Sequence, residues 1–329
     1  MSDSSVGWMA TSLKNSLLAL ADPVTADSAS LLAEYRRFYR LPEITAGRQH
    51  QMYRLDVEGY QLAVQQWRVE GARGNLLMVH GYYDHVGLYG SLIDFALQQR
   101  LNVLAFDLPG HGLSSGEQAS IDDFDTYRKV FVQLFEHGQQ QLPELPWIVV
   151  GQSTGGATLA TWLLHDRPQA NSCPVKDVWL LAPLLRPRGW STGRWLHTVA
   201  HPFLKRLKRH FSLNGNNPEF SRFLATMDPL QARYLSVRWV TALKRWIGWI
   251  ERQPPMAFPV LLVQGSADET VDWQHNLPCY QSLFRDLEVM MLEGGHHHLV
   301  NEEPVKRQRL YQHLAKRLTT ILAPASSEK

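Results

Sequence analysis

A serine lies at the centre of the glycine-rich segment Gly151–Gly156, which reads G-Q-S-T-G-G. Apolar residues precede it from 147 to 150 and follow it from 157 to 164, a pattern that predicts a buried strand leading directly into a helix. A turn this sharp strains the backbone at its central residue and brings strand and helix too close for Cβ atoms on the flanking residues. Ser153 is therefore a candidate nucleophile; the alternative is the chance occurrence of a short motif.

Two later segments supply the groups that a serine nucleophile needs. A serine hydroxyl reacts when a base takes its proton and an acid holds that base in place. Asp268 follows the apolar run 259–265, and three consecutive histidines, His296–His298, follow the run 287–292. The chain order Ser, Asp, His is the order of a catalytic triad built on a sheet with a nucleophile at a strand-to-helix turn.

Short apolar runs alternate with segments of helical periodicity along most of the chain. The alternation predicts an α/β fold, a mostly parallel central sheet with helices on both faces, in which ligands bind beyond the carboxyl ends of the strands. His80, Asp107 and Ser153 all lie at such ends. The expected strands are 51–57, 61–69, 75–79, 102–106, 147–150, 175–183, 259–265 and 287–292, and the expected helices are 88–100, 122–141 with Ser120 or Asp122 as its cap, and 302–321.

The interval between the strands 175–183 and 259–265 is far longer than one crossover helix requires. We therefore predict an inserted helical cap at 186–255, with helices at 195–211 and 235–250. The remaining organisation is an N-terminal helical extension at 1–48 with a helix at 30–39, a core formed by 49–185 and 256–323, and a flexible tail at 324–329.

The predicted cap is strongly basic. Thirteen Lys or Arg against three Asp or Glu between Arg186 and Arg252 give it a net charge of +10, which leaves −8 for the rest of a chain whose total is +2. Five of the eleven tryptophans also lie there. One interpretation is that the aromatic side chains face a substrate cleft while the cations are solvated, and the other is contact with a membrane surface. No nucleic-acid recognition motif accompanies the charge, so no nucleic-acid partner is expected.

The composition is that of an ordinary globular protein, with 44% hydrophobic and 19% charged residues among 329. Neither a membrane-spanning run nor a convincing signal peptide stands out, so we expect a cytoplasmic protein, with peripheral membrane contact through the cap as an addition. Cys173 and Cys279 have no metal-ligand spacing. We expect no metal and no cofactor.

Three motifs carry a resemblance to a known family. Residues 80–89 read H-G-Y-Y-D-H-V-G-L-Y, residues 107–114 read D-L-P-G-H-G-L-S, and the serine segment follows at 151–156. From about residue 50 to 320 the chain resembles the α/β-hydrolases of the monoacylglycerol lipase and lysophospholipase group. Two departures stand out: the turn reads Q-S-T where H-S-M is commonest, and the final turn reads G-G-H-H-H where the group has one histidine.

The resemblance selects a base among the three histidines. In the group, the histidine comes three residues after a glycine and five before a glutamate, which from Gly294 and Glu302 gives His297. His296 is the alternative base, followed by His298. Consecutive residues project in different directions, which argues against a shared metal site.

For the acid, Asp268 is favoured over Asp272, which lies farther into the same loop. Asp107 is expected to be structural and to hold the glycine-rich turn that follows its strand.

The oxyanion of an acyl-transfer reaction needs two backbone donors. By the geometry of this fold they are the N–H groups of Tyr82 and Thr154. His80 and His85 are expected to be structural, bonding to loop backbone. The candidate substrate-pocket residues are Tyr83, Gln152, Trp190 and Trp195.

The sequence thus predicts a serine carboxylic-ester hydrolase that forms an acyl-enzyme and acts on monoacylglycerol, lysophospholipid or a similar acyl ester. The alternative keeps the triad but changes the bond to an amide, peptide or thioester, or transfers the acyl group to another acceptor. A third reading, a non-catalytic hydrolase-like binding protein, is disfavoured because no triad member is missing from the chain.

Overall fold

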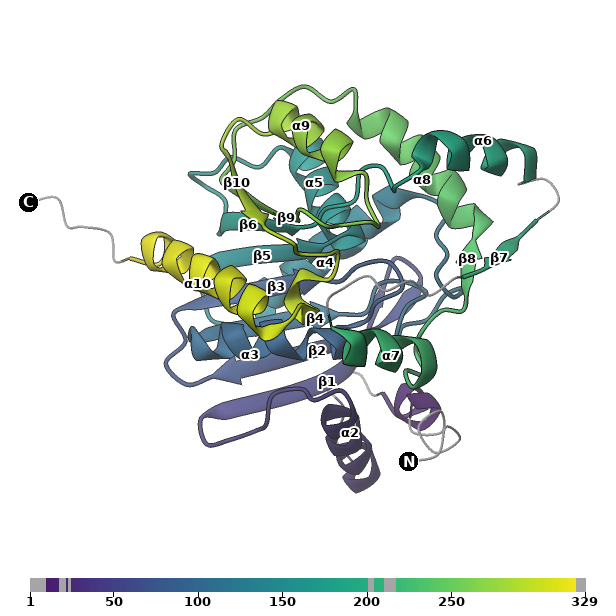
Figure 1. Ribbon diagram of the computed structural model, residues 1–329. Helices are drawn as coiled ribbons and strands as arrows, with labels where there is room; N and C mark the ends of the chain where they lie inside the picture. Colours follow the sequence, from purple (N-terminus) through teal and green to yellow (C-terminus); the bar gives the residue numbers. More distant parts are fainter. Residues whose placement is uncertain (1–9, 18–21, 23–24, 201–203, 210–216, 324–329) are drawn as a thin grey trace, which may run out of the picture.

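An eight-stranded sheet forms the centre of the protein, with strand order β1-β2-β4-β3-β5-β6-β9-β10 (Figure 1). The computed structural model describes residues 10–17, 22, 25–200, 204–209 and 217–323. The sheet consists of β1 (Arg48–Val57), β2 (Tyr60–Val69), β3 (Gly74–Val79), β4 (Leu101–Phe106), β5 (Trp147–Gln152), β6 (Val175–Leu181), β9 (Val260–Gly265) and β10 (Leu287–Leu292).

The sheet is mostly parallel, as the sequence predicts. β1 and β2 form an antiparallel hairpin and β2 pairs antiparallel with β4, whereas the other neighbouring strands are parallel. Every residue of β3, β4, β5 and β9 is buried. Strands covered on both faces read as continuous apolar runs, which is why they are recognisable in the sequence.

Helices cover both faces of the sheet, and β5 shows how the two cores are divided. Val149 packs into the core that contains α4 and α5, whereas Ile148 and Val150 face the core that contains α3 and α10. The fold predicted from the sequence is therefore confirmed. These helices are α2 (Ala26–Phe38), α3 (Gly90–Gln98), α4 (Phe124–Gln141), α5 (Thr154–Asp166), α9 (Trp273–Leu283) and α10 (Pro304–Ile321), with 3-10 turns η1 (Val86–Tyr89) and η2 (Leu299–Asn301).

Some element boundaries differ from those predicted. The cap of α4 is Asp123, whose carboxylate accepts from the Asp125 N–H, rather than Ser120 or Asp122. The helix expected at 88–100 is divided into η1 and α3. The helix α9 was not expected, and it contains Pro278.

The segment between β6 and β9 gathers at one end of the sheet (Figure 1). The helix expected at 195–211 is wrong in extent, because α6 ends at Ala200 and residues 206–208 pair antiparallel with residues 234–236. Strand pairing with a distant segment overrides local helical periodicity here. The segment contains α6 (Trp190–Ala200), β7 (Arg206–Lys208), α7 (Pro218–Thr226), β8 (Tyr234–Ser236) and α8 (Val237–Ile250). The domain boundaries stay predictions, and the predicted tail 324–329 lies outside the described residues.

None of the helices within the described residues has the length and apolar character needed to cross a bilayer. The cytoplasmic location expected from the sequence stays a prediction.

Candidate active site

The turn between β5 and α5 presents Ser153 in a strained backbone conformation, with φ 52° and ψ −110°. Glycines on either side of Ser153 permit this turn, because without a Cβ they let the backbones of β3, β5 and α5 approach each other closely. A Cβ on Gly155 would lie 2.1 Å from the Val79 carbonyl oxygen at the end of β3, and one on Gly151 would lie 2.4 Å from the Gly155 carbonyl. Ser153 therefore lies between strand and helix, next to the end of β3.

Asp268 and His297, from the loops after β9 and β10, meet beyond the carboxyl edge of the sheet. His297 Nδ1 lies 2.8 Å from Asp268 Oδ2. The carboxylate also accepts from the Thr270 N–H at 2.8 Å and from the Gln264 side-chain amide at 3.1 Å. These donors fix the carboxylate, and the carboxylate in turn fixes the tautomer and orientation of the imidazole.

The two groups shift each other's pKa. Burial by itself raises the pKa of Asp268. The charge of His297 and the hydrogen bond that it donates have the larger effect, so the pKa of Asp268 is lowered. Burial lowers the pKa of His297, and the neighbouring Asp268 carboxylate outweighs that effect and raises it. The arrangement favours an imidazole that gains a proton beside an ionised carboxylate, as a general base requires.

The three consecutive histidines have different partners. Of the three rings, that of His297 contacts Asp268. The His296 N–H donates to Glu302 Oε1 at 2.6 Å, while His298 Nδ1 lies 3.8 Å from Asp84 Oδ2. These contacts favour His297 as the base over both alternatives.

The alternative acid, Asp272, is the residue before α9, and its N–H donates to the Arg186 carbonyl at 2.9 Å. Its side chain is not placed against any of the three histidine rings by a hydrogen bond within the described residues.

Gln152 is the last residue of β5 and directly precedes Ser153. The sequence suggests a substrate-pocket residue, but the side chain is buried and its amide donates to the His297 carbonyl at 2.8 Å. It connects the strand that carries the serine with the turn that carries the histidine. Its Oε1 is buried and accepts no hydrogen bond within the described residues, and the pocket role stays a prediction.

The loop after β3 lies against the serine. A Cβ on Gly81 would lie 3.3 Å from Ser153 Cβ, which shows how close the loop comes. The His80 ring holds this loop, because its Nε2 accepts from the Leu108 N–H at 2.8 Å and its Nδ1 lies 2.7 Å from the Gly81 carbonyl. Burial lowers the pKa of His80 to about 3, so the ring is neutral and serves as a structural bridge between loops.

The predicted oxyanion donors, the N–H groups of Tyr82 and Thr154, lie on the two segments that flank Ser153. Across the described ranges, neither N–H donates to a protein acceptor. Thr154 is also the first residue of α5, where the helix dipole favours negative charge. Two such donors are what a developing oxyanion needs.

A buried junction holds the same loop from the side of the cap. His85 Nε2 lies 3.0 Å from Asp228 Oδ2, with both side chains fully buried. The Tyr39 hydroxyl, which follows α2, donates to Asp228 Oδ1 at 2.8 Å. Asp107 secures the loop from the other side by accepting from the Val86 N–H at 2.8 Å. The partner expected for His85 was backbone, whereas the structure adds a carboxylate between α7 and β8.

Aromatic residues connect the candidate oxyanion loop to the cap. The Tyr82 ring stacks on Trp239 of α8 with 3.8 Å between centroids, and Arg209 lies 3.9 Å above the Tyr83 ring. The sequence indicates Trp239 only as one of the five cap tryptophans, and it gives Gln264 no role. The helical aromatic spacing at 235–250 was a signal for Trp239, whereas nothing local distinguishes Gln264.

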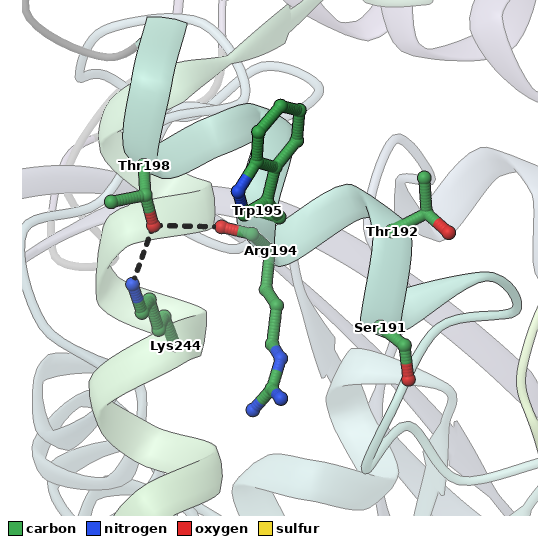
Figure 2. A pocket seen from close by; sticks show the side chains of 6 residues that line it. All are labelled: Ser191, Thr192, Arg194, Trp195, Thr198 and Lys244. Atoms are coloured by element: carbon green, nitrogen blue, oxygen red, sulfur yellow. Dashed lines mark hydrogen bonds between the residues drawn. The ribbon is translucent and has the colours of Figure 1, made fainter.

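The two tryptophans predicted to line the substrate pocket have different surroundings. Trp190 is buried in the core on the α4 and α5 side of the sheet. Trp195 is 65% exposed and borders a hollow of about 520 Å³ on the cap (Figure 2). The lining of that hollow includes none of the predicted triad: it consists of Ser191, Thr192, Arg194, Trp195, Thr198 and Lys244.

The fold places the chain among the α/β-hydrolases. A solved structure of a monoacylglycerol lipase from Paleococcus ferrophilus matches with a TM-score of 0.66 at 22% identity, covering 82% of this chain and 99% of that one. A soluble variant of monoglyceride lipase from Saccharomyces cerevisiae matches with a TM-score of 0.71 at 15% identity, covering 85% and 98%. A family model described as "Serine aminopeptidase, S33" matches residues 70–304. The chain therefore belongs to this family of hydrolases.

Relatives found by sequence similarity narrow the group of hydrolases to which the chain belongs. The monoglyceride lipase of Mus musculus is 31% identical over 261 residues, which are 76% of this chain and 84% of that protein. The monoglyceride lipase of Homo sapiens is 29% identical over 264 residues with the same coverage, and the phospholipase YtpA of Bacillus subtilis is 22% identical over 246 residues. The chain is a hydrolase of the monoglyceride lipase group, and the resemblance drawn from the three motifs is confirmed.

Proposed function

We propose that this chain is a serine carboxylic-ester hydrolase that forms an acyl-enzyme, with Ser153 as nucleophile, His297 as base and Asp268 as acid. The observation that carries the proposal is the 2.8 Å contact between His297 and Asp268 at the sheet edge where Ser153 occupies its strained turn. The hydrogen bond from Gln152, the residue before Ser153, to the His297 carbonyl supports placing the serine in the same site, which a chance serine motif does not explain.

The reaction follows from these positions. His297 Nε2 takes the proton of Ser153 while Oγ attacks the ester carbonyl, and the resulting oxyanion accepts hydrogen bonds from the Tyr82 and Thr154 N–H groups. Asp268 stabilises the imidazolium. The protonated His297 then gives its proton to the leaving alcohol, and a water molecule, deprotonated by the same ring, releases the acid.

The substrate class is supported by the relatives. Proteins named monoglyceride lipase and phospholipase align over most of this chain. A monoacylglycerol or lysophospholipid is the corresponding substrate here. The family description, which names an aminopeptidase, favours an amide or peptide bond as the second candidate.

Two experiments test the proposal. Ser153→Ala lowers the hydrolysis of p-nitrophenyl esters by at least about 10⁴-fold, because the residual rate comes from binding and the oxyanion donors alone. A fluorophosphonate probe labels the unmodified chain at Ser153. Full activity in the variant would contradict the assignment.

The bond that is cleaved is tested separately. Rates on monoacylglycerols and lysophospholipids of increasing acyl length are compared with rates on aminoacyl amides. A kcat/KM for amides above that for the lipid esters would favour the second candidate.

We further propose transient contact of the cap with a lipid surface. The cap combines its net charge of +10 with large apolar side chains that remain exposed, a combination that favours interfacial binding. The exposed members between α6 and β8 are Trp195, Leu204, Leu207, Met227 and Tyr234. Co-sedimentation of the full chain with phospholipid vesicles tests this contact.

A further inference from the structure

Two neighbouring hollows occupy the surface where α6 lies against α8. The larger, of about 520 Å³, contains Arg194 and Trp195 from α6 and Lys244 from α8 (Figure 2). The smaller, of about 340 Å³, shares Thr198 and Lys244 with it and adds Arg245. Two helices thus present cations and hydroxyl groups to one continuous depression.

Arg245 of the smaller hollow lies 3.9 Å from Asp123 Oδ2, whereas the two cations of the larger hollow have different surroundings. Among the residues that the structure describes, no carboxylate lies within 4.0 Å of Arg194 or Lys244. Other cap cations differ, since Arg206 and Arg238 both pair with Glu117. An anion that enters the depression would meet these two cations without competing with a carboxylate of the described residues.

The arrangement of donors suits phosphate. Lys244 Nζ lies 2.9 Å from Thr198 Oγ1, which in turn donates to the Arg194 carbonyl at 2.8 Å, so the lysine is held within the depression. A guanidinium offers two parallel donors to phosphate oxygens, and an ammonium adds a point charge. The Ser191 and Thr192 hydroxyl groups line the same space.

The exposed indole of Trp195 indicates a lipid source for that phosphate. The indole, which is 65% exposed, would gain no favourable apolar contact from a free phosphate ion bound beside it. A ring with an apolar body and a polar edge prefers the boundary between head groups and acyl chains. We propose that this depression, defined by Arg194, Trp195 and Lys244, binds the phosphate group of an anionic phospholipid. The inference rests on the proposed contact of the cap with a lipid surface.

The test compares two charge-matched double variants of the full chain. Arg194→Gln with Lys244→Gln removes the site, and Lys208→Gln with Arg222→Gln removes the same charge elsewhere on the cap. Binding is measured by co-sedimentation with phosphatidylcholine vesicles containing about 30% phosphatidylglycerol, and with phosphatidylcholine alone. The first variant loses about 30-fold in affinity for the anionic vesicles, which corresponds to about 1 kcal/mol for each of two cations in contact with the surface. The second variant loses less than about threefold, because Lys208 and Arg222 do not line the depression that holds the phosphate.

Two outcomes of the vesicle experiment overturn the proposal. An equal loss of vesicle affinity in both variants would mean that the cap binds through its net charge and not through a specific site. Inorganic phosphate that releases the unmodified chain from the vesicles at micromolar concentration would make free phosphate the ligand. Hydrolysis of a dissolved p-nitrophenyl ester stays unchanged in both variants, which shows that they fold. The activity of Ser153→Ala tests the proposed reaction, whereas vesicle binding tests the phosphate site, so the two proposals can fail separately.

Discussion

At the scale of single residues, His297 and Asp268 depend on each other for their protonation states. Burial alone lowers the pKa of the imidazole and raises that of the carboxylic acid, and each shift is reversed by the charge of the partner. A site that is nearly closed to solvent can therefore hold an imidazole basic enough to accept a serine proton.

This coupling predicts the pH dependence of activity. A protonated His297 cannot accept the Ser153 proton, so kcat/KM falls as pH decreases through the pKa of His297. Because that pKa is raised, the acid limb has its midpoint above the ordinary histidine value of about 6.5. Asp268→Asn removes the cause that raises it and leaves burial, so the midpoint moves to lower pH while the rate falls about 10⁴-fold. The pH dependence of kcat/KM on a dissolved ester measures both the midpoint and the rate. An unchanged midpoint in Asp268→Asn would contradict the coupling of the two groups.

Gln152 provides a second prediction at this scale. Gln152→Leu keeps the volume but removes the donor to the His297 carbonyl, so the base is displaced and kcat falls about 10- to 100-fold while KM changes little. Steady-state kinetics on a dissolved ester separate the two constants. Gln152→His retains a donor and restores part of kcat. A change confined to KM would instead support the pocket role predicted from the sequence.

At the scale of elements, the close packing of β5, α5 and β3 determines where the serine is presented. Gly155→Ala places a Cβ 2.1 Å from the Val79 carbonyl oxygen. The clashing atoms belong to the backbone of β3 and its following loop, which cannot move aside as a flexible side chain could. We expect the free energy of unfolding to fall by about 3 kcal/mol or more. In Gly248→Ala the new Cβ has no atom within 4 Å, and removing a helical glycine raises stability by about 0.5–1 kcal/mol. Denaturant unfolding compares the two.

The junction of the cap, α2 and the loop after β3 gives a further prediction. Asp228→Ala leaves the buried His85 and Tyr39 side chains without their partner, which costs about 3–5 kcal/mol in unfolding free energy. Glu219→Ala removes the exposed pair with Arg40 and costs less than about 1 kcal/mol. Equal effects in denaturant unfolding would show that burial of the first pair has no energetic consequence.

At the scale of the whole molecule, the charge is divided between a cap of +10 and a remainder of −8. Such a molecule orients in the field of an anionic surface, with the cap toward the surface. Raising salt from about 0.01 M to 0.15 M shortens the screening length from about 30 to 8 Å, so binding to anionic vesicles weakens at least about tenfold. Vesicle co-sedimentation across this range tests it. Binding that is independent of salt would assign the contact to the apolar side chains alone.

The sequence by itself determined the sheet, the family and the residues proposed for the triad. The central strands are buried on both faces, so continuous apolar runs reveal them. Ser153 directly follows one such strand, Asp268 comes in the loop after another, and His297 comes in the loop after the partly exposed edge strand β10. Chemistry at strand ends is readable because the parallel topology brings those ends to one edge.

Tertiary structure alone decided the contacts between segments far apart in the chain. Gln152 meets the His297 carbonyl 145 residues away, Asp228 joins His85 to Tyr39, and residues 206–208 leave the expected helix to pair with 234–236. No local pattern encodes these pairings, because each depends on where a loop or the cap lies after folding. The exposure of Trp195, at a hollow whose lining does not include Ser153, was decided in the same way.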